Sequence, residues 1–183
     1  KFGLTSSTDT HNGLGGGVAE KTFPGHLGFG DDTLLKRTSW DKEYAGNASN
    51  SPGGLIGVWA QENSRESLFI ALKNKEVFST TGPRIKPRLF GGWQYEQSLC
   101  DDPGRLETAF SDGVPMGQDL PAEGQTSAPT FLVSALADPG SAALPGTPLQ
   151  RLQIIKGWVD DEGQGHEKVF DVAGDANNGA TVN

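Results

Sequence analysis

The chain has 183 residues, 26 of them glycine and 11 proline, and a formal net charge of −8 from 15 basic and 23 acidic side chains. The acidic balance argues against nucleic acid as a partner, because binding to a phosphate backbone requires clustered lysine and arginine residues that displace counterions. Frequent glycine and proline favour turns over long helices, so the composition predicts a loop-rich chain of α/β to mostly β class, long enough for one domain or for part of one and a small second one.

The sequence also excludes other classes of partner and site. No apolar run approaches the roughly 20 residues that a membrane-crossing helix requires, so no membrane partner is expected. Cys100 is the only cysteine, which excludes an internal disulfide and a zinc site made of cysteines.

In chain order, the first predicted element is a short strand over residues 2–7, which ends in small hydroxyl residues. It delivers Asp9 and His11 to the loop at its carboxyl end. Residues 12–57 follow as a long stretch rich in Gly, Asp, Asn and Ser. Loops of this length are uncommon in compact domains unless they line a site, so we expect this segment to cover one.

The clearest predicted helix begins at Asn63, which can cap its first turn, and Glu66 occupies the capping-box position three residues later. Leu68, Phe69 and Leu72 form one apolar stripe. The helix is therefore expected to pack on the outside of a sheet or barrel.

Two strands are predicted after this helix, over residues 77–81 and 85–90, and Pro87 must lie at an edge or a bulge of the second. Beyond the second strand the chain changes to short extended runs separated by turns. A boundary is predicted here, with residues 1–90 in one unit and residues 91–183 in another.

The second unit is predicted to be rich in β-strands. Its best strands are residues 130–137, 149–159 and 168–172, and turn-forming Asp-Pro-Gly and Asp-Glu-Gly sequences separate them. Several strands without intervening helices favour an antiparallel sheet or a small sandwich. Exposed strand edges in such a region could drive self-association.

Asp9 and His11 are candidate metal ligands. Side chains two residues apart on an extended segment point the same way, and carboxylate and imidazole groups suit zinc, manganese or iron. The alternative is a turn with a satisfied polar pair, because a bare Asp-x-His pair is common and two ligands leave a metal site incomplete.

Three tryptophans, Trp59, Trp93 and Trp158, each lie in an apolar or strand-like run, so we predict burial against a sheet rather than stacking on carbohydrate. Carboxylates such as the pair Asp31-Asp32 are interpreted as solvated turn residues, since nothing in their spacing selects them for catalysis.

Five sequence blocks stand out along nearly the whole chain: FGLTSSTDTHN at residues 2–12, PGGLIGVWA at 52–60, FSTTGPRI at 78–85, GVPMG at 113–117 and PGTPLQR at 145–151. Together they resemble the bacterial family known as domain of unknown function 3604 (DUF3604). That family in turn resembles the polymerase and histidinol phosphatase (PHP) superfamily of metal-dependent hydrolases, in which a distorted TIM-like barrel carries two or three metal ions.

The resemblance implies a fold and a metal site. Residues 1–90 would supply the closing strand and helix of the barrel, and residues 91–183 an antiparallel, sandwich-like region. Asp9 would bind one metal ion and His11 another, with the zinc, manganese or iron ions activating a water molecule. The family's other ligands have no counterpart here and are expected before Lys1, so the chain is expected to be an inactive internal fragment that is cut at both ends.

Two further residues are catalytic candidates. His26 lies in the glycine-rich loop predicted to pass over the metal cluster, where it could bind substrate or act as an acid; an exposed loop histidine is the alternative. Arg84 could clamp an anionic substrate, because a guanidinium group offers paired donors to phosphate or carboxylate. A structural ion pair is equally compatible with its position.

The main hypothesis is therefore a fragment of a metal-dependent hydrolase whose parent acts on an ester, phosphoester or amide bond of a small-molecule substrate. The alternative is a non-enzymatic β-rich binding or structural module in which Asp9 and His11 only stabilise a turn. The sequence specifies neither the substrate nor the metal, and a soluble bacterial protein of the cytoplasm or of the periplasm fits it equally.

Overall fold

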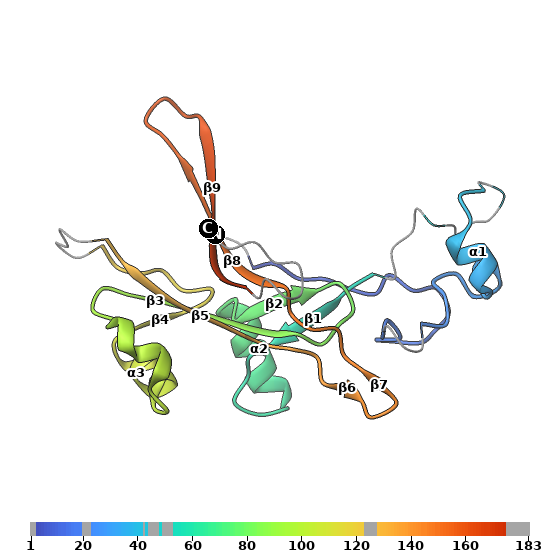
Figure 1. Cartoon of the computed structure of the whole chain (residues 1–183), viewed down its shortest axis with the longest axis horizontal. Helices are drawn as coiled ribbons and strands as arrows, with labels where there is room; N and C mark the ends of the chain where they lie inside the picture. The colour runs from blue at the N-terminus through green and yellow to red at the C-terminus, as the bar shows by residue number, and fades with distance from the viewer. Residues whose placement is uncertain are drawn as a thin grey trace.

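The computed structural model describes residues 3–19, 23–41, 43, 48, 53–122 and 128–174. Over these residues the chain is rich in short antiparallel strands and has few helices, which confirms the predicted β-rich character (Figure 1). In chain order the elements are η1 (Gly28–Gly30), α1 (Leu34–Thr38), β1 (Leu55–Val58), α2 (Arg65–Lys73), β2 (Val77–Thr80), β3 (Lys86–Gly92), η2 (Gln97–Asp101), α3 (Arg105–Ser111), β4 (Gly113–Pro115), β5 (Thr130–Leu136), β6 (Gly140–Ser141), β7 (Leu144–Pro145), β8 (Arg151–Val159) and β9 (Gly165–Gly174). The strands form a three-stranded sheet, β4-β3-β5, and the two-stranded sheets β1-β2, β6-β7 and β8-β9.

The three-stranded sheet holds the main hydrophobic core. Strand β3 lies in its middle, with β4 and β5 antiparallel on its two sides. Phe90 of β3 is in register with Leu132 of β5, and the Phe110 ring of α3 packs edge-on against the Phe90 ring at a centroid distance of 4.9 Å. Burial of an aromatic side chain contributes about 1.5–3 kcal/mol. The buried cluster consists of Phe90, Tyr95, Leu99, Ala109 and Leu132.

Helix α2 lies beside the β1-β2 pair (Figure 1), and its start differs from the prediction by one residue. Ser64, not Asn63, caps the helix: its backbone is extended (φ −116°, ψ 156°), and its hydroxyl accepts a hydrogen bond from the Ser67 amide at 3.2 Å. Ala71 is the buried residue of the helix, whereas Phe69, predicted for the packing stripe, is 64% exposed. The helix does pack, but on a face rotated from the predicted one.

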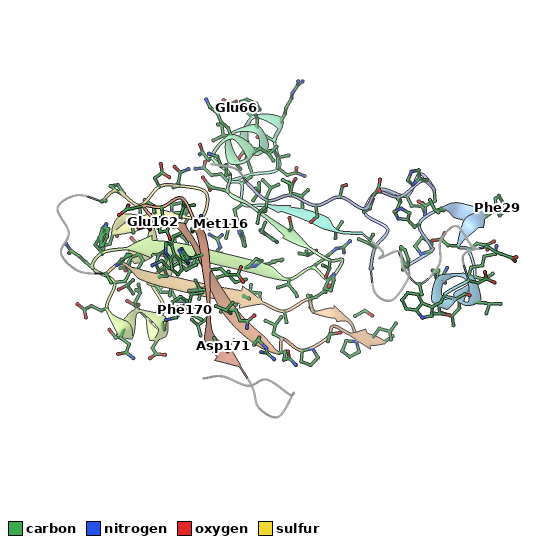
Figure 2. The ribbon with its side chains drawn as sticks, turned by 90° about the horizontal axis from the view of Figure 1, so that it is seen from above. Phe29, Glu66, Met116, Glu162, Phe170 and Asp171 are labelled. Carbon is green, nitrogen blue, oxygen red and sulfur yellow. The ribbon has the colours of Figure 1, made fainter. Side chains whose placement is uncertain are left out.

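Residues 3–8 lie along the β1-β2 pair, and an arm made of residues 9–19 and 23–41 then reaches away from the sheets and carries α1 (Figure 1). The predicted strand over residues 2–7 does not form in the part that the structure describes, residues 3–7. Asp9 interrupts the extended backbone with a φ of 49°, a left-handed conformation that Asp adopts more readily than most residues. Phe29 lies at the outer end of the arm (Figure 2) and is 91% exposed.

Strands β8 and β9 form a long hairpin that projects from the sheets (Figure 1) and contains the two predicted strands of this region. Almost every hairpin residue is exposed, because a two-stranded ribbon has no second layer against which to bury a face. The predicted burial of Trp158 is therefore wrong, since its side chain is 41% exposed. The predicted sandwich also does not form among the described strands.

The predicted barrel is not confirmed. Within the described ranges the strands form small open sheets and no closed barrel. The predicted division of the chain at residue 90 stays a prediction. The helices that the described part of the chain forms all lack the length and apolar character needed to cross a bilayer.

Candidate functional site

Three predicted site residues, Asp9, His11 and His26, lie together in the arm. The Nε2 atom of His26 lies 4.0 Å from Oδ2 of Asp9. The rings of His11 and His26 are 5.4 Å apart between centroids and tilted by 59°. The His11 amide donates a hydrogen bond to the His26 carbonyl at 2.8 Å, which joins the two segments through their backbones. The structure thus places the loop histidine beside the Asp-x-His pair.

Asp31 fixes the conformation of the histidine loop. Its side chain is among the fully buried ones, and its carboxylate accepts hydrogen bonds from the backbone amides of His26 and Leu27, the second at 2.7 Å. Gly25 has a φ of +98°, and a Cβ there would lie 2.6 Å from Oδ1 of Asp31, so glycine is required for this approach. Asn12 adds a hydrogen bond from Nδ2 to the Gly25 carbonyl at 2.8 Å. A buried carboxylate requires such donors, so Asp31 and the loop fix one another.

The segment before Asp9 is anchored at one end of the β1-β2 pair. The Gly54 amide donates a hydrogen bond to the Ser7 carbonyl at 2.9 Å. A Cβ at position 54 would lie 2.6 Å from Cβ of Ser6 and would overlap the Thr80 carbonyl at the end of β2. Glycine at this position therefore allows the Asp9 segment to lie directly against the sheet.

The acidic and imidazole groups differ in exposure. The His26 side chain is 13% exposed and the Asp9 side chain 82%. The Nδ1 atom of His26 is buried and has no hydrogen-bond partner among the described residues. Buried polar atoms are nearly always paired, so this nitrogen is an open position for a proton donor, a water molecule or a ligand.

The donor chemistry of the cluster suits a divalent metal ion only in part. Carboxylate oxygen and imidazole nitrogen are suitable ligands for zinc, manganese or iron, and the unpaired His26 nitrogen is compatible with them. Among the described residues, however, no group of three or more His, Cys, Asp or Glu side chains is arranged to hold a metal ion. These residues can therefore contribute ligands to a metal site but do not complete one.

Arg84, the fourth predicted site residue, lies in the segment between β2 and β3. Its backbone amide donates a hydrogen bond to Oδ2 of Asp138 at 2.7 Å. This bond is the main cause of a lowered pKa of the Asp138 carboxyl, with a second hydrogen bond from the Gly140 amide and the positive charge of Arg84. The Arg84 side chain lines a groove on the β1-β2 pair. In the described part of the chain no contact joins Arg84 to the histidines, and its role as a substrate clamp stays a prediction.

Asp31 is the site residue that sequence reasoning missed. The sequence favours a solvated turn for the Asp31-Asp32 pair. This prediction is correct for Asp32, whose exposed carboxylate forms an ion pair in which Oδ1 lies 2.7 Å from Nζ of Lys36. Asp31 instead turns inward to the loop amides. A carboxylate five residues after a Gly-His dipeptide carries no periodic signal, so only the folded loop distinguishes the two acids.

The comparisons with known proteins identify the family. The family model described as protein of unknown function (DUF3604) matches residues 1–182. The chain belongs to the DUF3604 family. No match was found among curated proteins or among solved structures. The match of this DUF3604 chain includes Asp9, His11, His26, Asp31 and Arg84, but the family description assigns no chemistry to them.

Proposed function

We propose that this DUF3604 chain contributes to the active site of a metal-dependent hydrolase of the PHP type. The observation that supports this proposal is the convergence of Asp9, His11 and His26 from two segments of the arm, with Nε2 of His26 4.0 Å from Oδ2 of Asp9 and the two imidazole rings 5.4 Å apart between centroids. The resemblance of the sequence blocks to that superfamily supplies the reaction class, the hydrolysis of an ester, phosphoester or amide bond.

In this proposal Asp9 and His11 bind metal ions, and further ligands come from beyond the described residues. Divalent zinc, manganese or iron held there supplies Lewis acidity for attack by water. His26 is not a ligand; its Nε2 atom, next to Asp9, passes a proton to or from the substrate. Asp31 positions His26 through the loop backbone, and Arg84 contributes positive charge toward an anionic substrate.

Substitution in the full-length protein that contains this chain tests the proposal. We expect two or three metal ions per protein molecule by elemental analysis, and hydrolysis of at least one of a phosphodiester, a carboxylester and an amide substrate. Asp9→Ala and His11→Ala should abolish hydrolysis and lower the metal content while changing the melting temperature little. Asp32→Ala, an exposed acid of the same arm, and His166→Ala, a distant histidine, are the matched controls and should keep both. A metal-free and inactive full-length protein would sink the proposal.

A second candidate function is a non-enzymatic binding module. The projecting β8-β9 hairpin favours it, because large apolar side chains such as Ile155 and Val159 are 67% and 69% exposed there, and exposed apolar surface marks interaction sites. In that case Asp9 and His11 only stabilise the conformation of the arm. Their substitution would lower the melting temperature of the arm and leave any activity of the full-length protein unchanged.

A further inference from the structure

A groove of about 420 Å³ lies along the β1-β2 pair and is lined by residues 55–59, by Phe78 and Thr80, and by residues 84–86. In the strand register Leu55 is paired with Thr80, and Gly57 with Phe78. Because alternate residues of a strand point to the same side and paired residues share a face, these four positions lie on one face of the pair. Trp59 continues this face beyond the end of β1. The volume lies within the range of about 300–1,000 Å³ found for small-molecule sites.

Two aromatic residues, Phe78 and Trp59, line this groove. Gly57 has no side chain, and the Phe78 ring lies over its position, so that a Cβ there would overlap the ring. The rings of Phe78 and Trp59 lie 5.8 Å apart between centroids with a tilt of 41°. The Trp59 indole is fixed by a hydrogen bond from Nε1 to the Pro87 carbonyl at 3.1 Å and by the Arg88 guanidinium, whose Cζ lies 3.6 Å from the ring centre. This aromatic surface is therefore apolar and preorganised.

Two exposed cationic side chains, Arg84 and Lys86, line the same groove. Neither the guanidinium nor the ammonium group forms a side-chain hydrogen bond or a salt bridge with another described residue. An acid, Asp138, lies next to Arg84: its carboxylate accepts a hydrogen bond from the Arg84 backbone amide at 2.7 Å and is within electrostatic reach of the Arg84 side chain. In a chain of net charge −8, two cationic side chains beside an apolar surface give a local positive charge that attracts anions.

We propose that this groove binds a small organic anion with an apolar body, such as a carboxylate that carries an alkyl or aryl chain. The carboxylate contacts Arg84 and Lys86, and the apolar body lies on the Phe78 and Trp59 rings. The groove begins at the Leu55–Thr80 end of the pair, next to Gly54 and the segment that leads to Asp9. The anion-binding groove can therefore serve the proposed hydrolase as a substrate-binding region, but its binding of anions does not rest on that activity.

Calorimetric titration of the protein with decanoate tests the proposal, with two reference compounds. Decyltrimethylammonium has the same apolar body and the opposite charge, and acetate has the same carboxylate without the body. We expect saturable binding of decanoate at one site, and binding at least about tenfold weaker for either reference compound, because each lacks one of the two contacts. Equal binding of decanoate and decyltrimethylammonium would show that the two cationic side chains do not act, and would overturn the proposal.

Two double variants test whether decanoate binds in this groove. Arg84→Gln with Lys86→Gln should weaken decanoate binding about tenfold or more, since two charge-assisted contacts are lost. Arg65→Gln with Lys73→Gln, on α2, removes the same charge outside the groove and should leave the affinity unchanged. Equal weakening in both double variants, or in neither, would overturn the assignment.

Further outcomes distinguish a small-anion groove from a peptide-binding site and from the proposed hydrolase activity. If a glutamate-rich peptide binds to Arg84 and Lys86 and decanoate does not, the groove is a peptide site and the proposal for a small anion is wrong. Decanoate binding that persists in Asp9→Ala, whether or not the full-length protein hydrolyses any ester, supports the groove independently of the hydrolase. Hydrolysis without decanoate binding removes the groove proposal alone.

Discussion

The β4-β3-β5 sheet and the arm are stabilised by different means. In the sheet, apolar side chains are buried around Phe90, which is 2% exposed, and the backbone groups pair along regular ladders. The arm buries little beyond Val18 and Asp31, each 2% exposed, and is held by side-chain to backbone hydrogen bonds such as that from Asn12 to Gly25.

The residues that stabilise the fold therefore lie in a different region from the residues of the candidate site. Apolar burial in the sheet is spread over many contacts that stabilise the whole core, whereas the conformation of a loop held by a few polar contacts depends on each of them. The arm carries Asp9, His11 and His26, so we expect the candidate site to open locally at a lower free energy than the β4-β3-β5 sheet. Each variant below tests whether the two regions are as independent as their packing indicates.

The largest effect is expected for Phe90→Ala. Removal of this ring from the core should lower the free energy of unfolding by about 3–5 kcal/mol, measured by urea denaturation. Phe131→Ala is the matched control: Phe131 lies on the neighbouring strand but is 49% exposed, so its loss should cost less than about 1 kcal/mol. Losses of similar size in the two variants would mean that Phe90 is not at the centre of the core.

Much of this packed region could be predicted from the sequence. The strands predicted over 85–90 and 130–137 occur as β3 and β5. Their pairing with each other could not be predicted, because it depends on contacts about forty residues apart that a local pattern does not encode. The helix before them was found for the same local reasons, although Ser64 caps it in place of Asn63.

The second prediction concerns the arm. Asp31→Ala leaves the amides of His26 and Leu27 without their buried acceptor, at a cost of about 1–3 kcal/mol. We expect hydrogen exchange of these two amides to accelerate about tenfold or more, while the urea midpoint of the core does not change. Asp32→Ala should affect neither amide, because its carboxylate faces solvent and Lys36. A parallel loss of core stability in Asp31→Ala would show that the two regions fold as one unit.

The conformation of the arm, in contrast, could not be predicted from the sequence. Asp9, His11 and His26 were identified as residue types that carry chemistry, but the predicted reason for the direction of the first two, an extended strand, does not hold because Asp9 is left-handed. The approach of His26 depends on Asp31 and Gly25, which are neither periodic nor apolar. Loop conformations of this kind are set by single hydrogen bonds, so they are visible only in the folded chain.

The third prediction concerns a polar contact within the core, made by Tyr95. Its hydroxyl donates a hydrogen bond to the Ala109 carbonyl at 2.6 Å, and burial, with a smaller effect of the Asp112 charge, raises the pKa of the phenol above 10.0. The folded state thus favours the neutral form, so this stability is complete below pH 10 and is lost as the pH rises toward the folded pKa. Tyr95→Phe should cost about 0.5–1.5 kcal/mol at pH 7 and should make unfolding less sensitive to pH above 10. An unchanged pH dependence in the variant would exclude Tyr95 as its source.

The smallest effect is expected at the tip of the β8-β9 hairpin, which like the arm is held by polar contacts outside the core. Oδ2 of Asp160 lies 2.5 Å from Nε2 of His166, and this hydrogen bond is the main cause of a lowered pKa of the partly exposed Asp160 carboxyl. The His166 ring in turn stacks on Trp158 at 5.2 Å. Because the pKa lies below the ordinary 3.8, the stabilisation that this hydrogen bond gives the tip is present above pH 3.8 and is lost as the pH falls through the lowered pKa.

Asp160→Asn should therefore give the Trp158 indole N–H at pH 7 the chemical shift that the wild type reaches only in acid, with no change in the urea midpoint of the core. Asp161→Asn, one residue away, should retain the wild-type titration. If the core midpoint falls together with the tip signal, the hairpin is coupled to the sheet, and stability outside the core cannot be assigned to local polar contacts alone.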